Sequence, residues 1–138
     1  MRDIVEHIVE ALGAGHDVVL VTVVGSKGST PRNAGSQMLV SETGLACGTI
    51  GGGAIEGHAI TKARTMVGEG TCFVEDLALR PQAANSIGMV CGGDAVLLYV
   101  PICAEDDAWT QVASLLLKCF ERRTPAYLAL ECREGGLP

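Results

Sequence analysis

Several signatures that would assign a function immediately are missing from this sequence. None of the six cysteines lies in a CxxC pair, because the two closest are twelve positions apart. This spacing argues against a zinc knuckle and against a thioredoxin-like redox pair. No GxGxxG occurs, so a Rossmann cofactor site has no support, and no GKS or GKT marks a phosphate-binding P-loop.

Basic clusters and long apolar runs are also absent. The net charge is -6, and no group of lysines and arginines could follow a phosphate backbone, so nucleic-acid binding is not expected. No apolar run approaches the roughly 20 residues that span a bilayer. The opening residues MRDIVEHIVEAL carry acids that a secretory signal would not. We therefore expect a cytoplasmic protein without a membrane span, whose thiols are mostly small core residues.

The 138 residues, 48% of them hydrophobic, suit one compact domain over 1–138. Helical spacing of apolar residues and β-branched runs predict a mixed α/β domain, with a largely buried mixed sheet flanked by about three helices. The elements expected in chain order are helix 2–13, strand 18–24, loop 26–35, strands 37–41 and 45–50, helix 55–67, strands 71–79 and 95–102, helix 109–120 and strand 126–131.

Three glycine-rich segments, each at the end of a predicted strand, carry the polar groups that chemistry needs. In the first, Gly25–Arg32, Ser29 and Thr30 offer hydroxyls and Arg32 offers a guanidinium fork that suits phosphate. Glycines allow the backbone to approach a ligand closely. The alternative is an ordinary polar loop with one solvated arginine.

The second segment, Gly48–Glu56, places Gly51, Gly52 and Gly53 between a strand and a helix. Amide N–H groups and the helix dipole would point the same way there and form an anion cradle. Glu56 suits the dipole but would compete with phosphate, and it could instead accept hydrogen bonds from an aminopyrimidine or pair with Arg32. The alternative is a tight strand-to-helix turn with a helix-stabilising acid.

In the third segment, Met89–Asp94, Cys91 stands beside Gly92 and Gly93. A thiolate at this position could contact molybdenum, as a soft metal, or carry sulfur. The alternative is a structural cysteine. Loops 25–35, 48–56 and 89–94 could converge on one edge of the sheet and form a single site.

Taken together, these motifs resemble the XdhC/CoxI family over about residues 1–103. The matching stretches, in chain order, are VTVV at 21–24, GSTPR at 28–32, Gly35, MLV at 38–40, Gly44, GTIGGG at 48–53, Glu56 and MVCGG at 89–93. The resemblance implies an accessory protein without turnover of its own. Such a protein transiently binds the molybdenum cofactor, as a mononucleotide or dinucleotide form, favours and protects its sulfurated form, and inserts it into hydroxylases of the xanthine dehydrogenase or carbon monoxide dehydrogenase type. The implied cofactor-binding residues are Ser29, Thr30, Arg32, Gly51, Gly52, Gly53, Glu56, Cys91, Gly92 and Gly93, with Cys91 as the molybdenum or sulfur contact.

The resemblance also implies partners. Longer family members carry a C-terminal Rossmann-like domain that these 138 residues lack, so a separate Rossmann-domain partner, a cysteine desulfurase and a homodimer are further expectations. The helix with Trp109 or an edge of the sheet at Val18–Val24 would supply the dimer contact. Two other hypotheses remain open, namely an enzyme with Cys91 as nucleophile and a regulatory subunit that binds no ligand.

Overall fold

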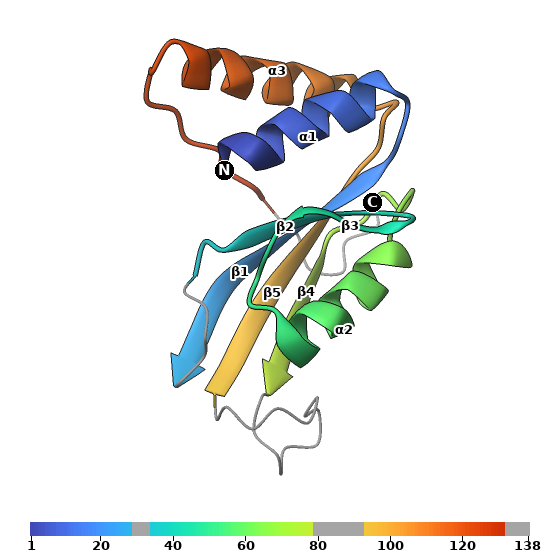
Figure 1. Cartoon of the computed structure of the whole chain (residues 1–138), viewed down its shortest axis with the longest axis vertical. Coiled ribbons are helices and arrows are strands. Elements are labelled where there is room, and N and C mark those ends of the chain that lie inside the picture. The colour runs from blue at the N-terminus through green and yellow to red at the C-terminus, as the bar shows by residue number, and fades with distance from the viewer. Residues whose placement is uncertain (29–33, 79–92, 132–138) are drawn as a thin grey trace.

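The computed structural model describes residues 1–28, 34–78 and 93–131 and shows three helices around a five-stranded sheet (Figure 1). The expected α/β class with three flanking helices is confirmed. The elements in chain order are α1 (Arg2–Gly13), β1 (Val18–Gly28), β2 (Gln37–Ser41), β3 (Gly44–Gly48), α2 (Gly53–Arg64), β4 (Phe73–Ala78), β5 (Gly93–Ile102) and α3 (Asp107–Glu121).

The sheet has the strand order β3-β2-β1-β5-β4, and all four of these pairings are antiparallel. Strand β1 is therefore the central strand, with β2 on one side and β5 on the other. The β1–β5 ladder runs from Val18 opposite Ile102 to Gly28 opposite Gly93, with a bulge between Val23 and Gly25. A bulge of this kind leaves one residue outside the ladder and increases the local twist.

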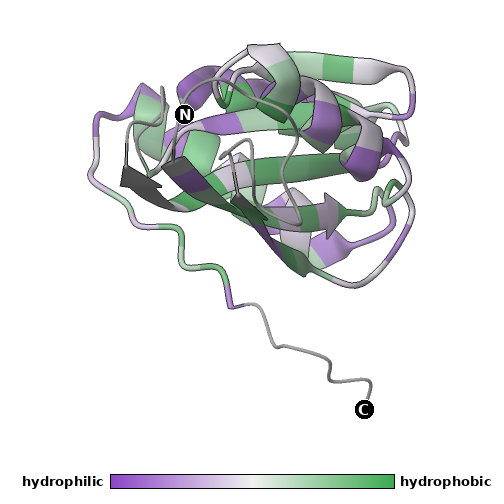
Figure 2. Ribbon diagram, turned by 90° about the horizontal axis from the view of Figure 1, so that it is seen from below, coloured by the Kyte–Doolittle hydropathy of each residue, from purple (hydrophilic) through white to green (hydrophobic). Residues whose placement is uncertain are grey.

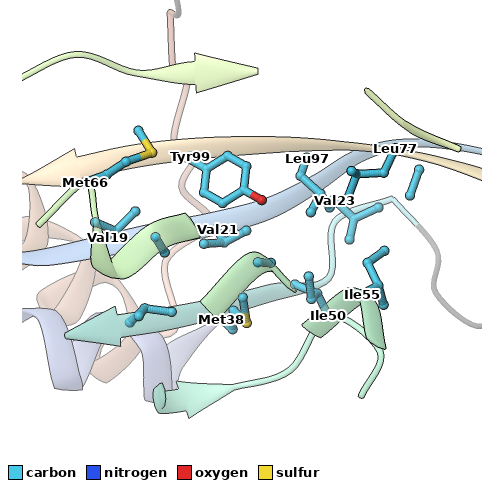
Figure 3. Close-up of a cluster of buried hydrophobic side chains, with 14 residues drawn as sticks. Val19, Val21, Val23, Met38, Ile50, Ile55, Met66, Leu77, Leu97 and Tyr99 are labelled. Carbon is cyan, nitrogen blue, oxygen red and sulfur yellow. The ribbon is translucent and has the colours of Figure 1, made fainter. Parts of the chain in front are cut away.

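Alternate side chains of the strands form two cores, one on each face of the sheet. On one face, α2 packs over residues that include Val19, Val21 and Val23, together with Tyr99 (Figure 3). On the other face, α1 and α3 cover Val18 and Leu20 of β1, Leu39 of β2 and several residues of β5. Hydrophobic residues dominate the central strands, whereas hydrophilic ones are concentrated in the helices and turns (Figure 2). Because both of their faces are covered, the central strands β1 and β5 read as continuous apolar runs.

Some expectations from the sequence were wrong. Strand β1 continues to Gly28, so residues 26–28 belong to the ladder with β5 and not to a loop. The expected mixed sheet contains only antiparallel pairings within the described ranges. Because Val18–Val24 lies in the middle of the sheet, it offers no edge for a dimer contact.

The predicted strand over 126–131 does not form. This segment has no regular secondary structure, and Tyr127 is 98% exposed. Leu128 and Leu130 instead line a small cavity beside Trp109 and Val112 of α3. Of the apolar residues that suggested a strand, only Leu128 and Leu130 are partly buried, and they lie beside α3.

Candidate functional site

The strand ends that flank the three glycine-rich segments lie at one end of the sheet. Gly28, the last residue of β1, is opposite Gly93, the first residue of β5, and Ala78 at the end of β4 is opposite Asp94. On the other side of β1, the start of β2 pairs with the end of β3 at Gly48. Figure 1 shows the beginning of α2 near the same end. Gly48 pairs with Met38, which lies opposite Val21, so it stands seven residues back along β1 from the Gly28–Gly93 pair. The convergence of the three segments stays a prediction, because 29–33 and 79–92 lie outside the described residues.

At this end, the loop between β3 and α2 is organised around the carboxylate of Glu56. Oε2 of Glu56 accepts a hydrogen bond from the Thr49 hydroxyl at 2.5 Å. The same oxygen accepts from the backbone N–H groups of Gly52 at 2.9 Å, Ile50 at 3.1 Å and Gly51 at 3.3 Å. Four donors thus converge on one oxygen, and the sequence-predicted anion cradle exists with an internal anion in it.

The glycines of this loop are required by its backbone. Gly51, Gly52 and Gly53 have φ values of 152°, 66° and 63°, in the region that disfavours residues with a Cβ. At Gly52 an added Cβ would meet no atom within 4 Å, so the space above the loop is open. At Gly48, with φ of 79°, an added Cβ would lie 2.5 Å from the Gln37 carbonyl oxygen and 2.8 Å from Cδ1 of Ile4. Gly48 therefore permits close packing at the sheet end, whereas Gly52 leaves a surface that a ligand can approach.

Glu56 stays ionised because its hydrogen bonds outweigh its desolvation. Partial burial opposes the charge, but the Thr49 hydroxyl and the amides of Gly52, Ile50 and Gly51 together lower the pKa of Glu56 below its ordinary value. The amides of Gly51 and Gly52 are consequently engaged by a negative group of the protein itself. A phosphate could use them only by displacing this carboxylate.

A second polar cluster on the α2 face was not predicted from the sequence. Nε2 of His58 in α2 lies 2.9 Å from Oε1 of Glu75 in β4, and the hydroxyl of Tyr99 in β5 donates to Oε2 of Glu75 at 2.6 Å. Burial, the hydrogen bond and the charge of Glu75 raise the pKa of Tyr99 far above its ordinary range. The three residues are far apart in sequence, so no local motif predicts that they lie together.

Several sequence-predicted site residues lie outside the described ranges. These are Ser29, Thr30, Arg32, Cys91 and Gly92. Gly93 begins β5 opposite Gly28, so its backbone is part of the ladder. The structure therefore brings Gly51, Gly52, Gly53 and Glu56 together and places the strand ends that lead to the other predicted residues at the same end of the sheet.

A groove of the described residues lies away from the glycine loop. It has a volume of about 730 Å³ and lies at the opposite end of the sheet, between the end of α1 and the β2–β3 turn, where His16, Asp17 and Glu42 are among its lining residues. Within 1–28, 34–78 and 93–131 no three histidine, cysteine or acidic side chains are arranged to hold a metal ion. In the same ranges no helix is long and apolar enough to cross a bilayer.

Two of the cysteines in the described ranges, Cys47 and Cys72, pack against the core on the α1 and α3 face of the sheet. Cys47, Cys72, Cys103 and Cys119 are half-buried and form no disulfide. Burial and the nearby Asp3 raise the pKa of the Cys47 thiol, and burial together with Asp17 raises that of Cys103. These two thiols are thus less reactive than ordinary cysteines.

Comparison with known proteins gives consistent matches. Residues 11–78 match the model of the XdhC and CoxI family. The chain is 44% identical over 99 residues to the molybdenum cofactor insertion chaperone PaoD of Escherichia coli K12, a match that covers 70% of this chain and 30% of PaoD. It is 35% identical over 83 residues to the uncharacterized protein YqeB of the same organism, covering 60% of this chain and 15% of YqeB.

A solved structure is similar as well. The crystal structure of a xanthine dehydrogenase from Bacillus halodurans aligns with a TM-score of 0.61 and 25% identity, over 83% of this chain and 35% of that chain. The chain thus spans about a third or less of the length of each of these relatives. The family-model match over residues 11–78 contains the whole loop from Gly48 to Glu56.

Proposed function

Because the chain belongs to the XdhC and CoxI family through residues 11–78, we propose that it is an accessory protein that binds the molybdenum cofactor and delivers it to a molybdenum hydroxylase. It acts by binding and release and performs no turnover of its own. The observation that carries this proposal is the loop of Gly51–Gly53 closed around Glu56, at the sheet end where the strands leading to the other two motifs also end.

The described residues fit one part of the cofactor better than another. A ring system can approach the loop above Gly52, where the surface is open. Glu56 is ionised there, and a carboxylate suits the N–H groups of an aminopyrimidine, which the pterin of the cofactor carries. Phosphate fits less well, because Glu56 already occupies the loop amides. We therefore assign the pterin end to Glu56 and the phosphate end to Arg32.

The proposal has finer parts that rest on the family resemblance. Cys91 contacts the molybdenum centre or its labile sulfur, because a soft thiolate suits a soft thiomolybdenum centre. Gly92 and Gly93 leave room for a bulky ligand, and Ser29 and Thr30 assist Arg32 at the phosphate. The acceptor is a xanthine dehydrogenase-type or carbon monoxide dehydrogenase-type hydroxylase. A cysteine desulfurase, a Rossmann-domain partner and a second copy of the chain belong to the same proposal.

The direct test is an anaerobic titration of the molybdenum cofactor onto the purified chain, followed by reconstitution of a cofactor-free hydroxylase. Wild type should retain the cofactor through gel filtration, with molybdenum and pterin absorbance in the protein peak, and should activate the hydroxylase. Arg32→Ala should weaken all forms of the cofactor alike, since phosphate is common to them. Cys91→Ser should weaken the sulfurated form selectively.

Glu56→Gln should weaken retention of every form of the cofactor, because it removes the charge that we assign to the pterin end, and Glu42→Gln is its matched control. Glu42 is exposed at the β2–β3 turn, at the opposite end of the sheet, so its loss of charge should leave cofactor retention unchanged. If Cys91→Ser activates the hydroxylase at the full rate, Cys91 does not contact the cofactor and has only a structural role. Complete failure of wild type to retain the cofactor would refute the proposal and favour a regulatory subunit that binds no ligand.

A further inference from the structure

The cluster of His58, Glu75 and Tyr99 connects three elements through one carboxylate. Glu75 of β4 uses both of its oxygens, Oε1 toward His58 of α2 at 2.9 Å and Oε2 toward the Tyr99 hydroxyl of β5 at 2.6 Å. The side chains of His58 and Glu75 are 35% and 18% exposed, and Tyr99 is fully buried. Figure 3 shows the ring of Tyr99 in the core beneath α2, close to Val21 and Leu97.

Each member of this cluster needs the others. A buried hydroxyl is costly without an acceptor, and Glu75 supplies one to Tyr99. A largely buried carboxylate in turn needs donors, and His58 and Tyr99 provide them. Because the Tyr99 proton stays on the hydroxyl and Glu75 only accepts when ionised, Nε2 of His58 is the nitrogen that carries a proton toward Glu75. The ring orientation of His58 is thereby fixed.

The cluster lies between α2 and β4, the strand with which α2 makes little apolar contact. The buried side chains of α2 are Ile55, Ala59 and Ala63, and the helix packs mainly on β1, β2 and β3. Toward β4, polar contacts bridge the two elements. One of these contacts joins His58 to Glu75. In the other, Nζ of Lys62, one turn after His58, lies 4.6 Å from the centre of the Phe73 ring.

We propose that His58, Glu75 and Tyr99 form a positioning network that holds the beginning of α2 at a fixed tilt over the sheet and so keeps the Glu56 loop closed. Glu56 lies only two residues before His58 on the same helix, and its carboxylate must reach Thr49 and the amides of Ile50 and Gly52 at the end of β3. A helix free to tilt away from β4 would lengthen these hydrogen bonds. The part of this inference that concerns cofactor retention rests on the proposed function, whereas the part that concerns loop closure does not.

The test compares two substitutions of His58 by hydrogen exchange of the Ile50, Gly51 and Gly52 amides. His58→Leu removes the donor to Glu75 while preserving bulk, and should speed exchange of these amides roughly five- to tenfold, as expected for loss of one hydrogen bond whose net contribution is reduced because His58 is partly exposed to solvent. His58→Gln keeps an N–H donor and should restore most of the protection, a rescue that loss of packing alone would not give. Tyr99→Phe should give an intermediate increase, because Glu75 loses one of its donors.

His16→Leu is the matched control, since His16 is exposed in the turn before β1, at the opposite end of the sheet from the beginning of α2 and the Glu56 loop, and should leave loop exchange unchanged. A parallel measurement follows retention of the molybdenum cofactor, which should fall roughly fivefold in His58→Leu and recover in His58→Gln. Unchanged loop exchange in His58→Leu overturns the positioning role whatever the cofactor does. Faster exchange in His58→Leu that His58→Gln rescues, in a wild-type chain that retains no cofactor, supports the positioning role and refutes the proposed function alone.

Discussion

Replacement of Glu56 by glutamine is the most informative single perturbation of the loop. The side chain keeps its length and one acceptor oxygen but loses the negative charge that four donors now share. A hydrogen bond to a charged group contributes about 1.5–3 kcal/mol and a neutral one about 0.5–1.5 kcal/mol. The four bonds share one oxygen and are not additive, and solvent reaches the group, so we expect a net loss of about 1–2 kcal/mol in the free energy of unfolding.

The same contribution has a predictable pH dependence. The pKa of Glu56 is lower in the folded protein than its ordinary value of 4.5, so ionised Glu56 stabilises the fold at every pH above that value. As the pH falls through the folded-state pKa, Glu56 becomes protonated and its contribution is lost. Wild type and Glu56→Gln should therefore differ in stability at about pH 7 and converge as the solution becomes acidic, below the ordinary value.

Urea unfolding followed by circular dichroism, from about pH 7 to about pH 3, measures this difference in stability. At neutral pH the melting temperature of Glu56→Gln should be about 3–6 °C lower than that of wild type. Glu42→Gln, which removes an exposed carboxylate at the other end of the sheet, should show no such difference. Equal stability of Glu56→Gln and wild type at neutral pH, or a stability difference that persists unchanged into acid, would refute the reasoning from hydrogen bonds to the charged oxygen.

Three further predictions follow from local geometry. Gly48→Ala should lower the free energy of unfolding by about 3–5 kcal/mol and Gly52→Ala by only about 1–2 kcal/mol. Both glycines have a positive φ, but only at Gly48 do other atoms block a Cβ, so the difference between the two variants in calorimetry measures the steric cost of the Cβ. Asp106→Ala should cost about 1 kcal/mol, because the side chain of this N-cap residue accepts a hydrogen bond from the Ala108 amide, while Asp106→Asn should retain most of that stability in the same melting assay. Cys47 and Cys103 should react with iodoacetamide more slowly than N-acetylcysteine at neutral pH, since their pKa values are raised, and mass spectrometry showing rapid labelling of either would contradict the assignment.

Periodicity predicted most of the fold because it reports burial directly. Apolar residues at helical spacing predicted helices α1 and α3, and continuous apolar runs predicted strands β1 and β5, which are covered on both faces. The segment 126–131 shows the limit of this reasoning. Leu128 and Leu130 are partly buried beside α3, and periodicity in so short a run cannot tell a strand from an extended segment that packs beside a helix.

The candidate site was predictable only where its parts are local. Gly51–Gly53 and Glu56 stand within six positions, and the competition between Glu56 and a phosphate for the loop amides follows from that spacing. The cluster of His58, Glu75 and Tyr99 was missed, because its hydrogen bonds depend on the registry of α2 against β4 and β5. The central place of β1 was also missed, since pairing order depends on the whole topology and not on the strand itself.

The antiparallel pairing of β1 with β5 has a consequence for how the chain folds. β1, β2 and β3 are connected by short segments and pair as neighbours, and β4 and β5 form a second neighbouring pair. Only the β1–β5 ladder joins the two groups, and it requires closure of a long stretch of chain, which is entropically costly and slow. We expect the two groups to form early and to dock late. Gly28 and Gly93 face each other across that ladder, so the end of the sheet at which we expect the three motifs to meet is completed by the slowest step of folding.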